Sequence, residues 1–174
     1  MADIALGVSK IEYGTYGDGI PPTTFTALTD PIARGTVVFN FSEPTDFRIE
    51  AEEQDDPVYV GSVKEDTDYV EFALISPVAA TMELLAGGDA TSDKWEAPIA
   101  IPEIIKSIKI TSKAVAGKMF EYTIVNGKIV ARLSQAPGKQ EADLLLVRVY
   151  IQAAITDDGV KNTPFIREMV NEPE

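Results

Sequence analysis

The sequence of 174 residues contains neither cysteine nor histidine. Their absence excludes disulfide bonds, thiolate chemistry, histidine-based zinc sites and base catalysis by imidazole. No apolar run approaches the roughly 18 residues that a membrane-spanning helix needs. The first ten residues also lack the basic and then apolar layout of a signal peptide. The sequence therefore predicts a soluble protein that is made in a cytoplasm.

Positive charge is scarce in the first half of the sequence. Residues 1–90 contain four basic and seventeen acidic side chains, whereas residues 91–174 contain eleven of each, so the formal net charge of −13 arises in the first half. The acidic residues are densest between Glu43 and Glu71. Such a surface repels phosphate groups, and its simplest interpretation is a solvated face that keeps the protein soluble.

One helix is clearly signalled, directly after a predicted strand at Tyr69–Ile75. Ser76 is expected to cap the helix, Pro77 fits its first turn, and Gly87 supplies a left-handed stop. Between these ends, apolar residues at i, i+4 and i+7 predict a stripe that packs on a β-sheet. The stripe consists of Val78, Met82 and Leu85.

Two strands are predicted ahead of this helix. Thr36–Phe41 and Asp46–Glu52 each alternate between apolar and polar residues, and the short segment Ser42–Pro44 joins them. We therefore expect them to form an antiparallel hairpin. In the second strand Phe47, Ile49 and Ala51 are expected to point into the core, and the outward side chains are Asp46, Arg48, Glu50 and Glu52.

A meander of strands is predicted after the helix. Ile104–Thr111 and Met119–Val125 alternate, and Asn126-Gly127, the strongest dipeptide for a hairpin turn, precedes a return strand at Lys128–Leu133. Leu144–Ala154 is nearly continuous in apolar character, as expected of a central strand. The whole pattern predicts a mainly β protein, a β-sandwich or partly closed barrel with one flanking α-helix.

The length and the hydrophobic content of 45% predict a single domain over residues 1–174. Its core is expected at about 4–155, followed by a polar C-terminal tail at 156–174. An apolar handle in this tail either folds back on the core or docks on a neighbour; it comprises Phe165, Ile166, Met169 and Val170.

The segment Glu53–Asp68 is expected to be a long loop. It is too long and too acidic for a tight turn, and only Val58–Val60 offers apolar residues. Its like charges favour an extended, disordered chain. Loops of this kind are either mobile or functional, and the charged residues here are Glu53, Asp55, Asp56, Lys64, Glu65, Asp66 and Asp68.

Carboxylates are the only side chains with catalytic potential that the sequence contains in large number. A catalytic pair needs unequal environments that separate its two pKa values, whereas these acids lie in open, like-charged company, so we expect no enzyme and no cofactor. Four of the aspartates could gather around a hard cation, but their spacing matches no EF-hand loop, and we expect no metal site.

One function that fits this composition is that of a monomeric β-sandwich that binds glycan or protein. In such a protein Trp95 and the tyrosines would line a concave face.

The order of these segments resembles the tail tube, or major tail, proteins of long-tailed bacteriophages, and more distantly the tube protein of type VI secretion systems. The resemblance covers roughly residues 4–155. It is carried by GDGIPPT, by FRIEAEEQDDPV, by EFALISPVAATMELLAGG at Glu71–Gly88, and by an NGK hairpin before a long final strand.

The resemblance implies a structural virion protein located in the tail. Family members form six-fold rings that stack into a hollow tube, and their inner strands join edge to edge between subunits. Here the lumen would be lined by Asn40, Asp46, Arg48, Glu50, Glu52 and Glu71, and the Glu53–Asp68 loop would become ordered on ring stacking. DNA would pass without specific binding, no membrane would be involved, and further partners would be other tail proteins such as the tape measure and the tail terminator.

Overall fold

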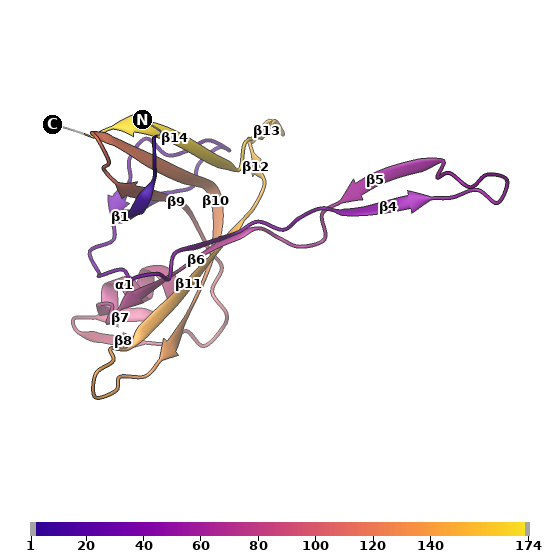
Figure 1. Cartoon of the computed structure of the whole chain (residues 1–174). Coiled ribbons are helices and arrows are strands. Elements are labelled where there is room, and N and C mark those ends of the chain that lie inside the picture. The colour runs from indigo at the N-terminus through magenta and orange to yellow at the C-terminus, as the bar shows by residue number, and fades with distance from the viewer. Residues whose placement is uncertain (1–2, 173–174) are drawn as a thin grey trace.

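The computed structural model describes residues 3–172. The described chain is mainly β, with the single helix α1 (Ala79–Ala86) (Figure 1). Its strands are β1 (Leu6–Thr15), β2 (Thr26–Ala27), β3 (Val38–Asn40), β4 (Thr45–Ile49), β5 (Tyr59–Val63), β6 (Tyr69–Ile75), β7 (Asp89–Thr91), β8 (Lys94–Glu96), β9 (Ile104–Lys113), β10 (Lys118–Gln135), β11 (Leu144–Ile151), β12 (Ala154–Ile155), β13 (Lys161–Asn162) and β14 (Phe165–Asn171).

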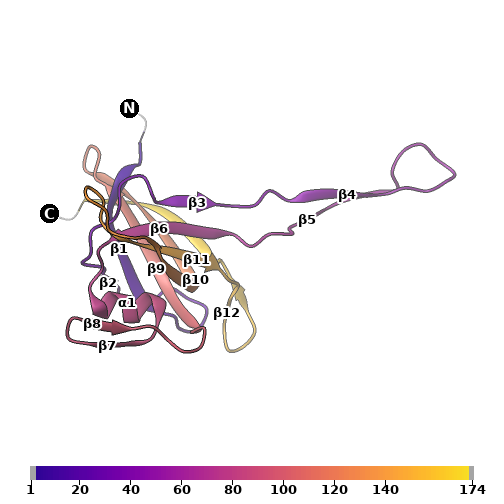
Figure 2. The same cartoon turned by 90° about the horizontal axis from the view of Figure 1, so that it is seen from below.

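The main sheet is antiparallel and divides at β10. Its strand order is β2-β1-β9-β10-β11-β6-β3, and β14 also pairs with β10. The first part of β10, up to Ile124, pairs with β14, and the part from Gly127 onward pairs with β11. Two layers result, one ending in β14 and the other in β3 (Figure 2). The buried apolar residues of both layers form one core.

The free ends of the two layers meet through aromatic side chains. The ring of Phe39 on β3 lies 5.0 Å from that of Tyr122 and 6.1 Å from that of Phe165 on β14. The ring of Phe41 lies 5.1 Å from that of Phe165. These contacts join side chains, and no backbone pairing links β3 to β14 in the described chain, so the sheet is not closed into a barrel. The class predicted from the sequence, mainly β with one flanking helix, is confirmed.

The predicted hairpin turn at Asn126-Gly127 is wrong, because β10 runs through both residues as one strand of 18 residues. The pair lies at an irregularity in the β9–β10 ladder, where β10 changes partner from β14 to β11. Asn126 Nδ2 donates to the Ala153 carbonyl oxygen at 2.8 Å. A Cβ at position 127 would meet Val149 Cγ1 at 2.6 Å, so glycine serves close packing here rather than a turn.

The helix begins later than predicted and is capped by a distant residue. Ser76 does not cap it; Val78 is the N-cap residue and has no side-chain cap. Instead the buried carboxylate of Asp30 accepts hydrogen bonds from Val78 N, at 3.0 Å, and from the Thr81 hydroxyl. This arrangement satisfies a backbone donor that a helix start leaves free. Gly87 ends the helix as expected, with φ of 74°.

Two of the three residues in the predicted apolar stripe are buried. Met82 and Leu85 lie in the core, where Leu85 is fully buried. The expectation for Val78 is wrong: its side chain is 57% exposed, because this residue precedes the first helical turn and has extended φ and ψ angles. The stripe is therefore shorter than the spacing suggested.

The expected end of the core near residue 155 is too early. Phe165–Asn171 forms β14, which pairs with β10 from Lys118 to Ile124. Residues 166, 169 and 170 of the expected apolar handle belong to this strand with Phe165, so the handle folds back on its own chain. The tail residues 173–174, like residues 1–2 of the predicted domain, lie outside the described part. No helix within residues 3–172 is long and apolar enough to cross a membrane.

Candidate assembly interface

A two-stranded hairpin projects far from the body of the protein. It consists of β4, β5 and the tip between them, and we call it the arm (residues 43–66) (Figures 1 and 2). The predicted pairing of Thr36–Phe41 with Asp46–Glu52 is wrong, because β3 pairs with β6 whereas β4 pairs with β5. The predicted loop Glu53–Asp68 is also wrong in part, since it contains the whole of β5. Both errors have one cause: the polar segment at Ser42–Pro44 continues outward instead of turning back.

One face of the arm is apolar and lies in solvent. Residues directly opposite each other in an antiparallel pair share a face, so the register places Phe47 and Ile49 beside Gly61 and Tyr59. The rings of Phe47 and Tyr59 lie 5.9 Å apart over Gly61. The exposed fractions are 43% for Phe47, 53% for Ile49, 55% for Tyr59 and 46% for Val63. The first two residues were expected in the core, and they are not part of it.

The opposite face of the arm is mainly polar, and its tip is acidic. Asp46 and Arg48 share the polar face with Val60, which is 54% exposed, and with Ser62, whose hydroxyl donates to Asp46 Oδ1 at 2.5 Å. From residue 43 to residue 66 the chain carries nine acidic and two basic side chains. The exposed acids at the tip are Glu50, Glu52, Glu53, Asp55 and Asp56, and Glu65 and Asp66 lie on the returning strand side. The arm is thus an amphipathic ribbon with strong negative charge.

The base of the arm is fixed by Asp68. Its Oδ1 accepts a hydrogen bond from Ser42 N at 2.9 Å, and its Oδ2 forms an ion pair with Lys64. The Ser42 hydroxyl also donates to the Asp66 carbonyl oxygen at 2.9 Å. Burial raises the pKa of Asp68, but the bonds from Lys64 and Ser42 outweigh it and hold this pKa below its ordinary value. Asp68 therefore joins the outgoing and returning segments. Sequence analysis did not predict this role, because Asp68 was counted among the acids of the predicted loop.

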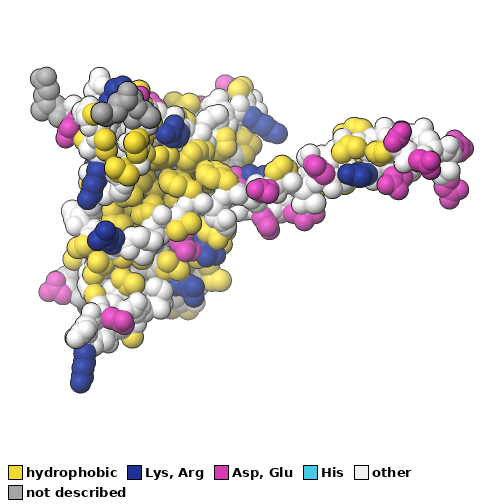
Figure 3. All heavy atoms as spheres, in the orientation of Figure 1, with side chains coloured by type: hydrophobic (Ala, Val, Ile, Leu, Met, Phe, Trp, Pro, Cys, Tyr) yellow, Lys and Arg dark blue, Asp and Glu magenta, His cyan; other side chains and the backbone are white. Residues whose placement is uncertain are grey.

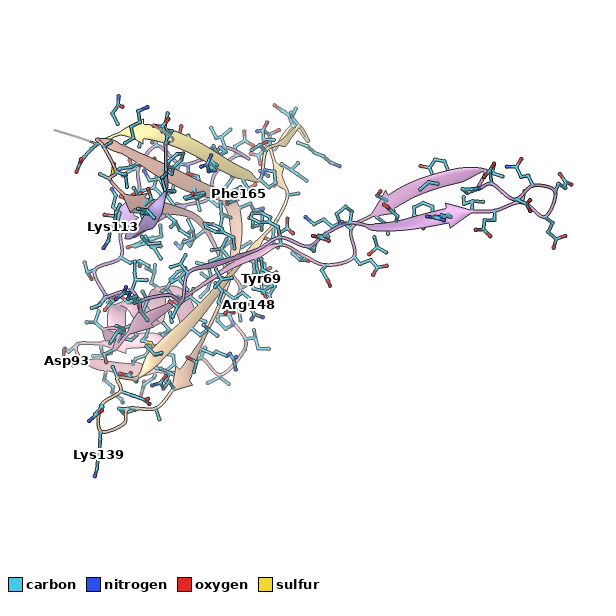
Figure 4. All side chains as sticks on the ribbon, in the orientation of Figure 1. Tyr69, Asp93, Lys113, Lys139, Arg148 and Phe165 are labelled. Carbon is cyan, nitrogen blue, oxygen red and sulfur yellow. The ribbon has the colours of Figure 1, made fainter. Side chains whose placement is uncertain are left out.

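The six residues predicted to line a lumen do not lie together. Asn40 and Glu71 share one face of the β3-β6-β11 layer, Asp46 and Arg48 lie on the arm, and Glu50 and Glu52 lie at its tip. Figure 4 shows Arg148 and Tyr69, which mark the first of these places.

Glu71 is neutralised by a partner that sequence analysis did not find. Arg148 on β11 lies directly opposite Glu71 on β6, and the two side chains form an ion pair of 2.6 Å. The guanidinium also lies over the Tyr69 ring, 4.4 Å from its centroid. Hydrogen bonds to the Tyr150 hydroxyl and to Glu71 raise the pKa of Arg148. Lys128 and Arg132 of β10 share this face, so the sheet face itself is basic and the acidic excess belongs to the arm.

Trp95 is partly buried and packs against the core, and its Nε1 donates to the Gly87 carbonyl oxygen at 2.8 Å. Among residues 3–172, no group of three or more acidic side chains is arranged to hold a metal ion.

Comparison with known protein families gives no match, and no curated protein sequence matches the chain. The geometry of the arm and the body therefore carries the functional argument.

Proposed function

We propose that this protein is a structural subunit that assembles with copies of itself into stacked rings, and that the rings form the tube of a long-tailed bacteriophage tail. The observation that carries the proposal is the arm, a long ribbon whose apolar face is open to solvent. An exposed apolar surface of this kind marks a site of interaction with another molecule.

The energetics of the arm favour a partner. An isolated two-stranded hairpin is marginally stable in water, and this one has no core of its own. Full burial of an apolar side chain contributes about 1.5–3 kcal/mol. The arm exposes four large ones on one face, namely Phe47, Ile49, Tyr59 and Val63. A neighbouring molecule that covered this face would recover several kcal/mol and would also hold the ribbon in place.

The sheet edges are suited to the same kind of assembly. β2 and β3 stand at the two ends of the main strand order, so each leaves one edge unpaired within the described residues. Exposed strand edges are templates for pairing with another chain. In a ring, edges of neighbouring subunits would pair with one another and would no longer be exposed.

The charge distribution gives the arm a second role in this proposal. Its apolar face would dock on a neighbour, and its acidic polar face and tip would remain in contact with solvent. In a tube, these acids would line the lumen and keep DNA from binding as it passes. Glu71 would contribute little to this repulsion because Arg148 neutralises it.

Sedimentation velocity of the purified protein and of an Ile49→Asp variant would test the proposal. The native chain should form large species as its concentration rises, and the variant should stay small because it places a charge on the apolar face of the arm. Val160→Asp is the matched control, since Val160 is similarly exposed but lies between β12 and β13. Equal association of all three proteins would rule out an arm-mediated assembly.

A further inference from the structure

An apolar cavity of about 310 Å³ opens between the helix and the end of β10. The β9–β10 ladder ends at Ile104 and Ile129, whereas the β10–β11 ladder continues to Gln135. The chain ahead of Ile104 therefore diverges from β10 and leaves a space beside it. Met82, Leu85, Trp95, Ala131 and Leu133 are among the residues that line this cavity.

The rim of the cavity carries two fully exposed isoleucines, Ile99 and Ile101. Pro98 and Pro102 flank them and restrict the backbone of this short segment. Leu133, which is 55% exposed and shares the core-side face of β10 with Ile129 and Ala131, extends the apolar surface along this strand. A contiguous exposed apolar surface beside a cavity marks an interaction site. Figure 3 shows that apolar side chains cover much of the body on the face in view, whereas acidic side chains follow the arm to its tip.

The apolar face of the arm has the right chemistry for this cavity. Phe47 and Tyr59 form an adjacent aromatic pair, and aromatic side chains in apolar pockets are the usual anchors of protein interfaces. Arg132 is the one charged residue among those at the cavity, and it shares the other face of β10 with Lys128. The strand beside the cavity is therefore basic, whereas the arm carries nine acidic and two basic residues, so overall charge favours the approach of the arm.

The arm and the cavity of one molecule are directed apart. In both views the arm points away from α1 and β8, the elements that border the cavity (Figures 1 and 2). A contact between them must therefore join two copies of the chain. It would be heterologous, with different surfaces on the two partners, and contacts of this kind generate closed rings or open filaments.

We propose that the arm of one copy inserts Phe47 and Tyr59 into the cavity between α1, residues 98–102 and β10 of a second copy. This assignment rests on the proposed function and adds to it the surface that receives the arm.

Disulfide cross-linking tests the assignment directly, because the native chain has no cysteine. A mixture of Tyr59→Cys and Ile101→Cys proteins is oxidised, and the 59–101 disulfide is measured by mass spectrometry. A disulfide forms only when the two Cα atoms approach within about 7 Å, so we expect roughly tenfold more of this link than of a 59–160 link. The control mixture contains Tyr59→Cys and Val160→Cys, whose residue 160 is exposed on another hairpin.

A charge placed on the rim of the cavity gives a second measurement that leaves the fold of the arm untouched. Ile101→Asp should weaken self-association about tenfold in sedimentation equilibrium, because a charge would then face the apolar side of the arm. Val160→Asp introduces the same charge at an exposed residue between β12 and β13 and should have little effect. Association without the 59–101 link, and unchanged by Ile101→Asp, would overturn the cavity assignment alone. Absence of any self-association would overturn both this assignment and the proposed function.

Discussion

Asp68 and Ser42 hold together the two chain segments at the base of the arm. The carboxylate of Asp68 accepts a hydrogen bond from the backbone amide of Ser42 at 2.9 Å and pairs with Lys64 on its other oxygen. Beyond this point the arm is not part of the main sheet, because within the described chain β4 and β5 pair only with each other. The Asp68 carboxylate therefore links the outgoing and returning segments at the place where the arm leaves the body.

This relationship predicts a pH dependence at the base of the arm. The pKa of Asp68 is lowered in the folded protein, so its contribution is present above the ordinary aspartate pKa and is lost as the pH falls through the lower folded value. We expect the amide resonance of Ser42 in NMR spectra to shift with an apparent pKa below 3.8, the ordinary value. Asp68→Asn should abolish this transition. A transition at or above the ordinary value would contradict the assigned hydrogen bonds.

The helix provides a test of the core. Leu85 is fully buried, so Leu85→Ala should lower the free energy of unfolding by about 2–5 kcal/mol. Val78→Ala removes a side chain that is 57% exposed and should change it by less than about 0.5 kcal/mol. Chemical denaturation of both variants measures the difference. Equal effects would mean that α1 does not pack on the sheet through Leu85.

The ion pair between Arg148 and Glu71 should contribute modestly to stability. Both side chains are partly exposed, at 36% and 24%, and pairs of this kind contribute about 0–1 kcal/mol, with a similar amount from the contact of Arg148 with the Tyr69 ring. Arg148→Met should therefore lower the free energy of unfolding by about 1 kcal/mol. Part of this loss should disappear when the native protein and the Arg148→Met variant are compared at high salt. A loss that is independent of salt would assign the effect to packing alone.

Lys64 gives a proteolytic measure of how well the arm is ordered. It is the only lysine or arginine between residues 49 and 68 and lies on the returning side of the arm. Trypsin should cut after Lys64 faster in free subunits than in an assembled form, because docking would immobilise the arm. Lys139, in the exposed segment between β10 and β11, is the internal control. Equal rates at Lys64 in both forms would show that the arm is not ordered by assembly.

The fold class followed from local signals, whereas the path of the chain did not. Alternation at Tyr69–Ile75 and the glycine stop at Gly87 are properties of a few neighbouring residues, and both are found in the structure. Asn126-Gly127 has the composition of a turn, but Gly127 is required by the approach of Val149 from another strand. Contacts with residues far along the chain decide such positions, and one sequence does not report them.

The arm was hidden for a related reason. The acidic residues around it suggested a disordered loop, and the alternation of Tyr59, Gly61 and Val63 is only five residues long. That alternation was the available signal, together with the matching alternation at Phe47 and Ile49. The apolar face of the arm has the same alternation as a face buried in the core. Alternation does not distinguish a surface that packs within one chain from a surface that lies exposed. The same ambiguity explains why Phe47 and Ile49 were expected in the core.

Self-assembly is the central claim, and electron microscopy of the concentrated, purified protein tests it most directly. The account predicts hollow rings or tubes for the native chain and their loss in the Ile49→Asp variant, with the Val160→Asp control still assembling. A uniform population of single subunits at high concentration, with no rings or tubes in the native sample, would contradict it.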